Sequence, residues 1–192
     1  MSVNRKQLIL EAATKSFSLF GYKATTMEQV AKIANVGKGT IYTFYENKEQ
    51  LFKEIVLRMI SEMKAEAEQV IQPDLSFNEN LHRALYRILE FRKEHQLSIK
   101  LFQEEKEMGT PAVQEMLDEV EMAIVSYITG KIQIAIDKKE IRPCNPEIMA
   151  FLMLKTYFAL IVDWEKNHPP LEKEEIAELL QLYLFEGLSI KS

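Results

Sequence analysis

The chain has 192 residues, of which 47% are hydrophobic and 28% are charged. This profile indicates a globular protein with a sizeable core and excludes a disordered chain. The net charge of −5 is unevenly distributed along the chain. Residues 1–48 hold seven Lys and Arg against three Asp and Glu, a surplus of four, so the remainder carries −9. Only the basic N-terminal segment is therefore suited to bind a polyanion.

Glycine and proline are scarce, with six of each, and helix-forming Leu, Ile, Met, Glu and Lys are abundant. Turn and capping residues divide the chain into about nine helices. We therefore predict an all-α fold. Seven of the expected helices have both ends marked: near Arg5 to Phe20, Met27 to Ala34, Lys38 to Tyr45, Lys48 to just before Pro73, Leu97 to Glu107, Asn145 to His168, and Glu172 to Leu188. Two more have a marked start only, one at Ser76 and one at Thr110.

Several helix ends carry specific signals. Gly21 can stop the first helix, and Gln29 stands three residues after Thr26, which is the spacing of a capping box. Ser76 with Glu79 repeats this spacing, and the pairs Thr110-Pro111 and Asn145-Pro146 place a cap before a proline in the first helical position. One face of the first helix is predicted to be apolar: Ile9, Ala12, Ala13, Phe17 and Phe20.

Residues 27–45 predict two short helices joined by a turn at Asn35, Val36 and Gly37, within the basic part of the chain. Asn is one of the few residues besides Gly that tolerate a left-handed turn. Five apolar residues have the spacing to form a small core with the first helix: Val30, Ala34, Val36, Ile41 and Tyr45. This is helix-turn-helix geometry, in which the second helix enters the major groove of DNA.

The outward face of that second helix follows from its inward face. If Ile41 and Tyr45 point inward, the helical step of about 100° per residue directs Gly39 and Thr43 toward the groove. The residues that flank them are Lys38, Thr40 and Tyr42. Lys48 begins the next helix, where its charge and the free backbone N–H groups suit a phosphate.

Each outward residue type suits one kind of DNA contact. Gly39 would let the helix backbone approach DNA closely. The hydroxyls of Thr40 and Tyr42 and the ammonium of Lys38 suit phosphate oxygens. Thr43 is the candidate for a base edge, because it can meet a thymine methyl or a hydrogen-bonding group.

At these positions the chain resembles the TetR family of bacterial regulators. The resemblance covers about residues 8–52, and its spaced residues are Phe20-Gly21-Tyr22, Thr25-Thr26, Val30-Ala31, Ala34-x-Val36, Gly39-Thr40-Ile41-Tyr42-x-x-Tyr45 and Asn47-Lys48-Glu49-x-Leu51-Phe52. It implies DNA-contacting roles for Thr26, Lys38, Thr40, Tyr42, Thr43 and Lys48. It also implies a ligand-responsive regulator that is released from DNA by a small effector. The sign of regulation implied by the resemblance is repression.

Three positions depart from the usual family pattern. Asn35 stands where the turn commonly has Gly, Gly37 where a Ser often caps the recognition helix, and Tyr45 where Phe is common. Gly at a helix N-cap costs only about a few tenths of a kcal/mol relative to Ser. We therefore expect DNA binding to persist with a shifted site preference.

Residues 1–47 are thus predicted to form a DNA-binding domain, and residues 48–192 a helical domain for effector binding and dimerisation. Residues 148–162 are apolar nearly all round, and the last helix adds a further apolar face. Two such helices have more apolar surface than one core needs, which favours a four-helix interface with a second copy. The resemblance implies the same homodimer on a palindromic operator.

The second domain also holds large, adaptable side chains that could line an effector pocket: Tyr86, Phe91, Phe102, Met108, Met116, Met122, Tyr127, Tyr157, Phe158 and Trp164. At helical spacing such residues are more often ordinary core, so no pocket residue is assigned. Cys144 is interpreted as an incidental thiol, and the three histidines lack paired metal-ligand spacing. No cofactor is expected besides the effector.

Two other classes of function stay open at this level. An enzyme would need a nucleophile–base or metal constellation, and no catalytic residues are visible, so we predict no enzyme. A helical dimer that acts through protein partners could retain an unused helix-turn-helix. The polar start is unlike a signal peptide, and the most apolar segment is interrupted by Lys155 and shorter than the ~18–20 residues that span a bilayer, so we expect a cytoplasmic protein without a membrane span.

Overall fold

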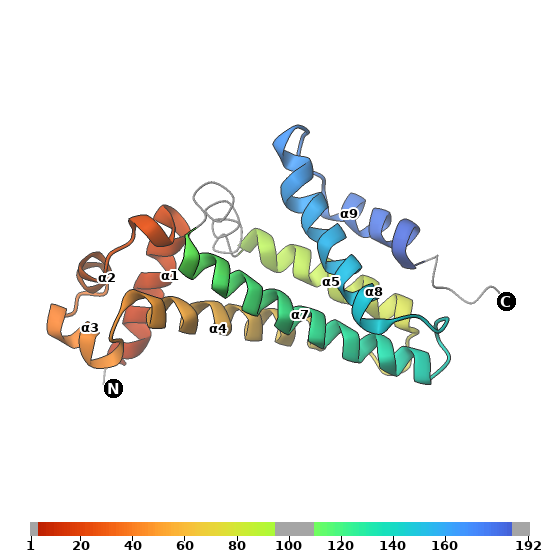
Figure 1. The fold of residues 1–192 in the computed structure, drawn as a ribbon, viewed down its shortest axis with the longest axis horizontal. Coiled ribbons are helices and arrows are strands. Elements are labelled where there is room, and N and C mark those ends of the chain that lie inside the picture. Colours follow the sequence, from red (N-terminus) through yellow and green to blue (C-terminus); the bar gives the residue numbers. More distant parts are fainter. Residues whose placement is uncertain (1–3, 95–109, 186–192) are drawn as a thin grey trace. The chain divides into compact units, whose positions relative to one another are not determined.

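The computed structural model describes residues 4–94 and 110–185 (Figure 1). It contains eight α-helices within those ranges and no β-strand, which confirms the all-α prediction. The helices are α1 (Arg5–Ala24), α2 (Met27–Ile33), α3 (Lys38–Phe44), α4 (Lys48–Gln69), α5 (Phe77–Glu94), α7 (Pro111–Asp137), α8 (Pro146–Phe158) and α9 (Lys173–Leu180). The helix predicted from Leu97 to Glu107 lies outside the described residues.

The described residues form two compact units, one of residues 4–62 and 110–120 and the other of residues 63–94 and 121–185. Helices α4 and α7 each contribute residues to both units. The domain boundary predicted between residues 47 and 48 stays a prediction.

In the first unit, α1, α2 and α3 pack on one another. Asn4 caps α1, because its Oδ1 accepts a hydrogen bond from the Gln7 backbone N–H at 3.2 Å. The ring centroids of Phe17, Tyr22 and Phe52 lie 4.8–5.9 Å apart, and this aromatic cluster joins α1 to α4.

The first helix departs from its prediction in two details. Gly21 has φ 80° and ψ 174°, so the helical path breaks there as expected, but a further turn follows and α1 ends at Ala24. Only glycine adopts that conformation without strain. Phe20 was predicted on the buried face and is instead 52% exposed, whereas Ile9, Ala13 and Phe17 are fully buried.

The turn between α2 and α3 forms as the sequence predicts. Asn35 has φ 52°, and its N–H donates to the carbonyl of Lys32 at 3.2 Å while the Val36 N–H donates to the carbonyl of Ala31 at 3.0 Å. This is the Schellman arrangement, which satisfies the last carbonyl groups of α2. The small core is confirmed for Val30, Ala34, Ile41 and Tyr45, which are buried, whereas Val36 is half-buried.

The second unit has a core drawn from α5, α7, α8 and α9 and the short segments beside them. Its buried members are Leu89, Ile132, Ala135, Ile141, Ala150, Met153, Ile161, Ile176 and Leu180. The predicted caps are present: Asn145 Oδ1 accepts from the Ile148 N–H at 3.1 Å, and Glu79 Oε2 accepts from the Ser76 N–H at 3.0 Å.

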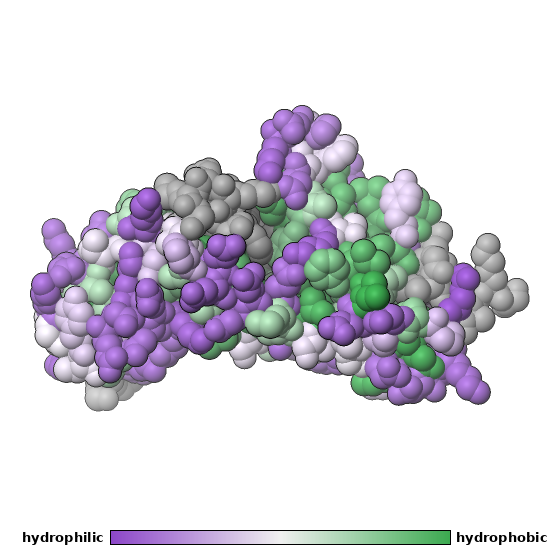
Figure 2. Space-filling view, in the orientation of Figure 1, coloured by the Kyte–Doolittle hydropathy of each residue, from purple (hydrophilic) through white to green (hydrophobic). Residues whose placement is uncertain are grey.

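The two last helices are less regular than predicted. After α8 the chain continues as a π-helical turn, η1 (Ala159–Asp163), and a 3-10 turn, η2 (Trp164–Lys166), and α9 continues as a π-helical segment, η3 (Gln181–Phe185). Large apolar side chains remain exposed on these elements: Ile148, Phe151, Leu152, Trp164, Leu182 and Tyr183. Figure 2 shows hydrophobic side chains gathered over α8 and α9.

Candidate nucleic-acid interface

The outward face of α3 has the composition and exposure that the sequence predicts. Ile41 is fully buried and Tyr45 is 3% exposed, so both anchor the helix from below. Four of the five predicted contact residues on α3 are exposed and Thr40 is half-buried: Lys38, Gly39, Thr40, Tyr42 and Thr43. The structure therefore brings these five residues to one helix, and their contacts with DNA stay a prediction.

The hydroxyl groups on this surface keep capacity for a ligand. Tyr42 is 42% exposed. Thr43 Oγ1 donates to the carbonyl of Thr40 at 2.7 Å, which orients the hydroxyl and leaves its oxygen lone pairs and its methyl group to meet another molecule. A threonine held in this way can accept a hydrogen bond or contact a thymine methyl.

Gly39 has open space on the side where a Cβ atom would project. A Cβ built there would meet no atom within 4 Å. The folded chain itself therefore does not require glycine at this position. The role predicted for Gly39, close approach of the helix backbone to DNA, stays a prediction.

Thr26 lies at the N-terminus of α2, where the predicted capping box is present. Its Oγ1 accepts from the Gln29 N–H at 3.2 Å, and Gln29 Oε1 accepts from the Thr26 N–H at 3.2 Å. Thr26 is exposed. Its hydroxyl proton is not committed by the capping bond that it accepts, so it can donate to a phosphate.

Glu28 was not foreseen as part of this surface. Its Oε1 lies 2.7 Å from Lys38 Nζ, so an ion pair joins α2 to α3. The hydrogen bond to Lys38 lowers the pKa of the Glu28 carboxyl, and the same bond raises the pKa of Lys38. Both side chains are exposed, so the ion pair adds little to stability. It does place a negative charge beside Lys38, which is predicted to contact a DNA phosphate. The two residues are ten apart on different helices, and no local spacing signals the pair.

Lys48 lies at the start of α4, as predicted, but its ammonium group points back toward α1. Nζ donates to the carbonyl of Tyr22 at 2.7 Å and to the carbonyl of Thr25 at 2.9 Å. It also lies 4.1 Å from the centroid of the Tyr22 ring. The side chain is therefore engaged with the chain itself, and its predicted phosphate contact is untested.

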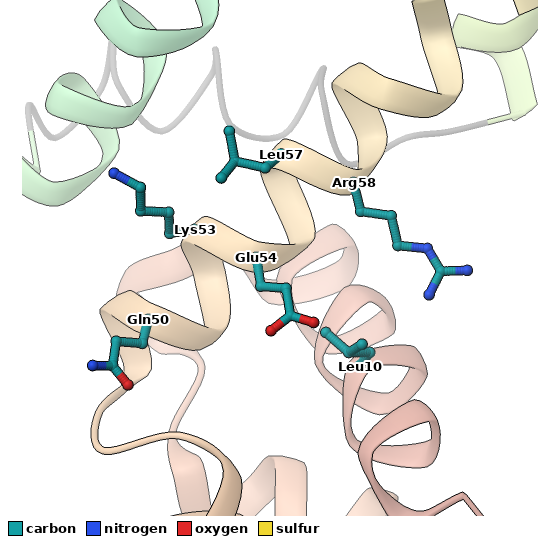
Figure 3. A pocket seen from close by; sticks show the side chains of 6 residues that line it. All are labelled: Leu10, Gln50, Lys53, Glu54, Leu57 and Arg58. Atoms are coloured by element: carbon teal, nitrogen blue, oxygen red, sulfur yellow. The ribbon is translucent and has the colours of Figure 1, made fainter. Parts of the chain in front are cut away.

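A shallow pocket in the same unit is lined by residues of α1 and α4 (Figure 3). Its lining residues are Leu10, Gln50, Lys53, Glu54, Leu57 and Arg58. The carboxylate of Glu54 points toward α1, accepts from the Tyr45 hydroxyl at 3.1 Å and pairs with Lys6 at 2.8 Å. Burial and the bond to Glu54 raise the pKa of Tyr45, so the phenol stays neutral. Glu54 thus fixes the end of α3 to α4.

The suggested effector residues in the second unit divide between its surface and its core. The hydroxyl of Tyr86 donates to Glu174 at 2.7 Å, and the hydroxyl of Tyr127 donates to Glu68. Trp164 stacks on His168 with ring centroids 3.9 Å apart, and Met122 is 64% exposed. Phe102 and Met108 lie outside the described residues. Phe91 is buried, and Tyr157 and Phe158 pack against the core of this unit. The effector pocket stays a prediction without assigned residues.

Two absences apply to the part of the chain that the structure describes. Residues 4–94 and 110–185 contain no group of three or more His, Cys, Asp or Glu placed to hold a metal ion. Within the same ranges, no helix combines the length and apolar character needed to cross a bilayer.

Comparison with known proteins decides the family. Residues 9–55 match the model of the bacterial regulatory proteins of the tetR family. A Bacillus subtilis protein named as the uncharacterized HTH-type transcriptional regulator YhgD is 62% identical over 189 residues, which cover 98% of this chain and 99% of that protein. The chain belongs to the TetR family. It is therefore a TetR-family transcriptional regulator, as the spaced residues around α3 predicted.

Solved structures of other TetR-fold proteins confirm the architecture. The SmeT–triclosan complex matches with a TM-score of 0.82 at 16% identity, covering 99% of this chain and 94% of that one. AibR in complex with isovaleryl coenzyme A and operator DNA matches with a TM-score of 0.68 at 22% identity, covering 94% and 98%. At these identities the likeness concerns the fold alone.

Proposed function

We propose that this TetR-family protein is a ligand-responsive repressor in the cytoplasm, whose homodimer binds a palindromic operator and is released by a small effector. The observation that carries the proposal is the polar, exposed face of α3 above the buried side chains of Ile41 and Tyr45. A helix that used this face to pack against another element would place large apolar side chains there. Here it holds a lysine, hydroxyls and a glycine with open space beside it.

The proposed contacts divide into two kinds. One kind contacts phosphate oxygens and fixes the orientation of the helix-turn-helix on DNA: Lys38, Thr40, Tyr42 and the Thr26 hydroxyl. Thr43 meets a base edge, and Gly39 supplies the close approach that allows it. Arg and Lys neutralise phosphates and release counterions, so binding must weaken steeply as salt rises.

The proposed dimer forms through α8, α9 and the segments that follow each of them. On α8, Ile148 is 57% exposed, Phe151 43% and Leu152 46%, and on η3 Tyr183 is 71% exposed. A cluster of large apolar side chains on adjacent elements is the kind of surface that an isologous dimer covers. A two-fold axis through this interface would present two copies of α3 to half-sites about one DNA turn, ~34–36 Å, apart.

The proposed effector binds the second unit and changes the affinity of the dimer for DNA. The structures of SmeT with triclosan and of AibR with isovaleryl coenzyme A support effector binding in proteins of this fold. By linkage, an effector that weakens DNA binding must itself bind less tightly to the DNA complex. Repression is the simpler sign of regulation, because occupying DNA is enough to block transcription, whereas activation requires a further contact with the transcription machinery.

The proposal is tested by gel-shift binding to the DNA that flanks the protein's own coding region. We expect a saturable shift with wild-type protein and its loss in a Tyr42→Ala, Lys38→Ala double variant, because both side chains are exposed and neither supports the core. Sedimentation should show that the double variant assembles as wild type does. Unchanged DNA binding by a folded double variant would sink the site assignment.

A further inference from the structure

The ammonium group of Lys48 joins the first residue of α4 to the last turn of α1. Its two carbonyl acceptors, on Tyr22 and Thr25, lie at 2.7 and 2.9 Å, and the aromatic ring of Tyr22 lies 4.1 Å away. Carbonyl groups at the C-terminal end of a helix carry a partial negative charge and favour a cation. The side chain is half-buried. Lys48 therefore serves as a cap for α1 that is supplied from another helix.

The segment that Lys48 holds leads directly into α2. Thr25 is fully buried, and its hydroxyl donates to the carbonyl of Gly21 at 2.8 Å and lies 3.0 Å from the hydroxyl of Ser16. The next residue, Thr26, is the N-cap of α2. Since α2 ends in the fixed turn at Asn35, the direction in which this segment leaves α1 sets where α2 and α3 point.

We propose, as an extension of the proposed function, that Lys48 is a positioning residue for DNA binding. It holds the turn between α1 and α2 so that Thr26 and α3 face the DNA together, and this is its role in place of the phosphate contact suggested by the sequence. The two carbonyl bonds use two of the three N–H donors of the ammonium and hold it against α1. Moving it outward to a phosphate would break both charge-assisted bonds in a partly buried turn, at a cost to the same surface that must bind. The free protein and the DNA complex therefore share this contact.

The test compares Lys48→Met with Lys38→Met, a matched loss of one lysine on the exposed face of α3. DNA affinity is measured across a range of salt, at a temperature where melting curves show both variants fully folded. We expect Lys48→Met to lower affinity at least about tenfold and to lower Tm, with the slope of log affinity against log salt unchanged. Lys38→Met should instead reduce that slope by about two, about one for each protomer of the proposed dimer, and leave Tm unchanged.

Two results with Lys48→Met would overturn the proposal. A slope reduced by about two, about one for each protomer, with an unchanged Tm would show that Lys48 neutralises a phosphate. Unchanged affinity with a lowered Tm would show a purely structural role. Absence of DNA binding by wild-type protein would overturn the proposed function itself. That outcome is distinguished from a failure of the Lys48 proposal, because it is seen without any substitution.

If Lys48→Met does not fold, the wild-type protein supplies the same answer through NMR of its ¹⁵N-labelled lysine ammonium groups. We expect the Lys48 signal to be visible in the free protein, because hydrogen-bonded ammonium protons exchange slowly with water, and to stay in place when operator DNA is added. The Lys38 signal should move. A Lys48 signal that shifts on DNA addition as far as that of Lys38 would overturn the proposal.

Discussion

Glu28 and Lys38 form an ion pair of 2.7 Å that joins α2 to α3 on the exposed side of the helix-turn-helix. The pair places a carboxylate beside one of the side chains proposed to meet a phosphate. Two opposing effects follow on DNA binding: the carboxylate orients the lysine, and it also repels the DNA backbone and competes for the ammonium. Because both side chains are exposed, orientation contributes little, and repulsion should be the larger effect.

Replacing Glu28 by Gln should therefore strengthen DNA binding. We expect DNA affinity to rise about three- to tenfold at a salt concentration of about 50 mM. The gain should be smaller at about 200 mM, because exposed charges are screened within a Debye length of about 10 Å at 0.1 M. Fluorescence anisotropy with a labelled operator measures both values. Glu62→Gln is the matched control, since Glu62 pairs with Arg58 on α4 at similar exposure and should leave affinity nearly unchanged. Weaker binding by Glu28→Gln would contradict this account and show that the ion pair acts by orienting Lys38.

Replacing Gly39 by Ala should separate DNA binding from stability. The added methyl group meets no atom within 4 Å in the folded chain, and alanine is favoured over glycine in helices by up to about 1 kcal/mol. Thermal melting should show an equal or higher Tm, whereas DNA affinity should fall because the methyl group occupies the space through which the backbone approaches the groove.

Gly130→Ala provides the control for that comparison. Gly130 lies in α7, and a Cβ there also meets nothing within 4 Å. We expect a similar gain in Tm without loss of DNA affinity. Equal DNA affinities for the two alanine variants would show that close approach at Gly39 is not used.

Introducing a charge on the exposed face of α8 should prevent dimer formation. Phe151→Glu places a carboxylate among apolar side chains that we propose to be covered by a second copy, and burial of an unpaired charge is strongly unfavourable. Sedimentation equilibrium should show a folded monomer. Ile134→Glu, on α7 at 52% exposure, is the control that should sediment as wild type does. A dimer that persists in Phe151→Glu would place the interface elsewhere.

The second unit should lose stability in acid, partly through Glu68. Hydrogen bonds from Lys131 and Tyr127 lower the pKa of this carboxyl below its ordinary value of 4.5. A carboxyl with a lowered pKa in the folded state stabilises the protein above its unfolded-state pKa, and that contribution is lost as pH falls through the folded-state pKa. The side chain is 45% exposed, so we expect an effect of less than ~1 kcal/mol.

Urea unfolding as a function of pH measures this contribution. Glu68→Gln should be less stable than wild type near neutral pH, and the difference should shrink below about pH 4. Glu147→Gln, at an exposed position in the first turn of α8, serves as a comparison for loss of one carboxylate. A difference between wild type and Glu68→Gln that is constant from neutral to acid pH would refute the assignment.

Local features of the fold could be predicted because they depend on neighbouring residues. The break at Gly21, the left-handed turn at Asn35 and the caps at Thr26 and Asn145 each follow from the chemistry of one short segment. The family could be recognised for the same reason, since its spaced residues lie within a continuous stretch. The π-helical turn after Phe158 follows no such local signal, and the sequence predicted a continuous helix there.

The electrostatic detail of the surface could not be predicted in this way. Lys48 and the Tyr22 carbonyl are 26 residues apart, and their contact exists only after α1 and α4 have packed through Phe17 and Phe52. The ion pair of Glu28 with Lys38 likewise depends on the angle between two helices. Such contacts follow from tertiary packing, so a helical wheel places the side chains on the correct face without naming their partners.

The most direct test of the central claim is a salt titration of wild-type protein binding to the DNA beside its own coding region, with footprinting of the complex. The account predicts saturable binding to an imperfect palindrome, two protected half-sites about one DNA turn apart, and a steep linear fall of log affinity with log salt, about 0.9 for each neutralised phosphate. No saturable binding by a folded dimer, at this DNA or among random duplexes, would contradict the account and favour a regulator that acts through protein partners.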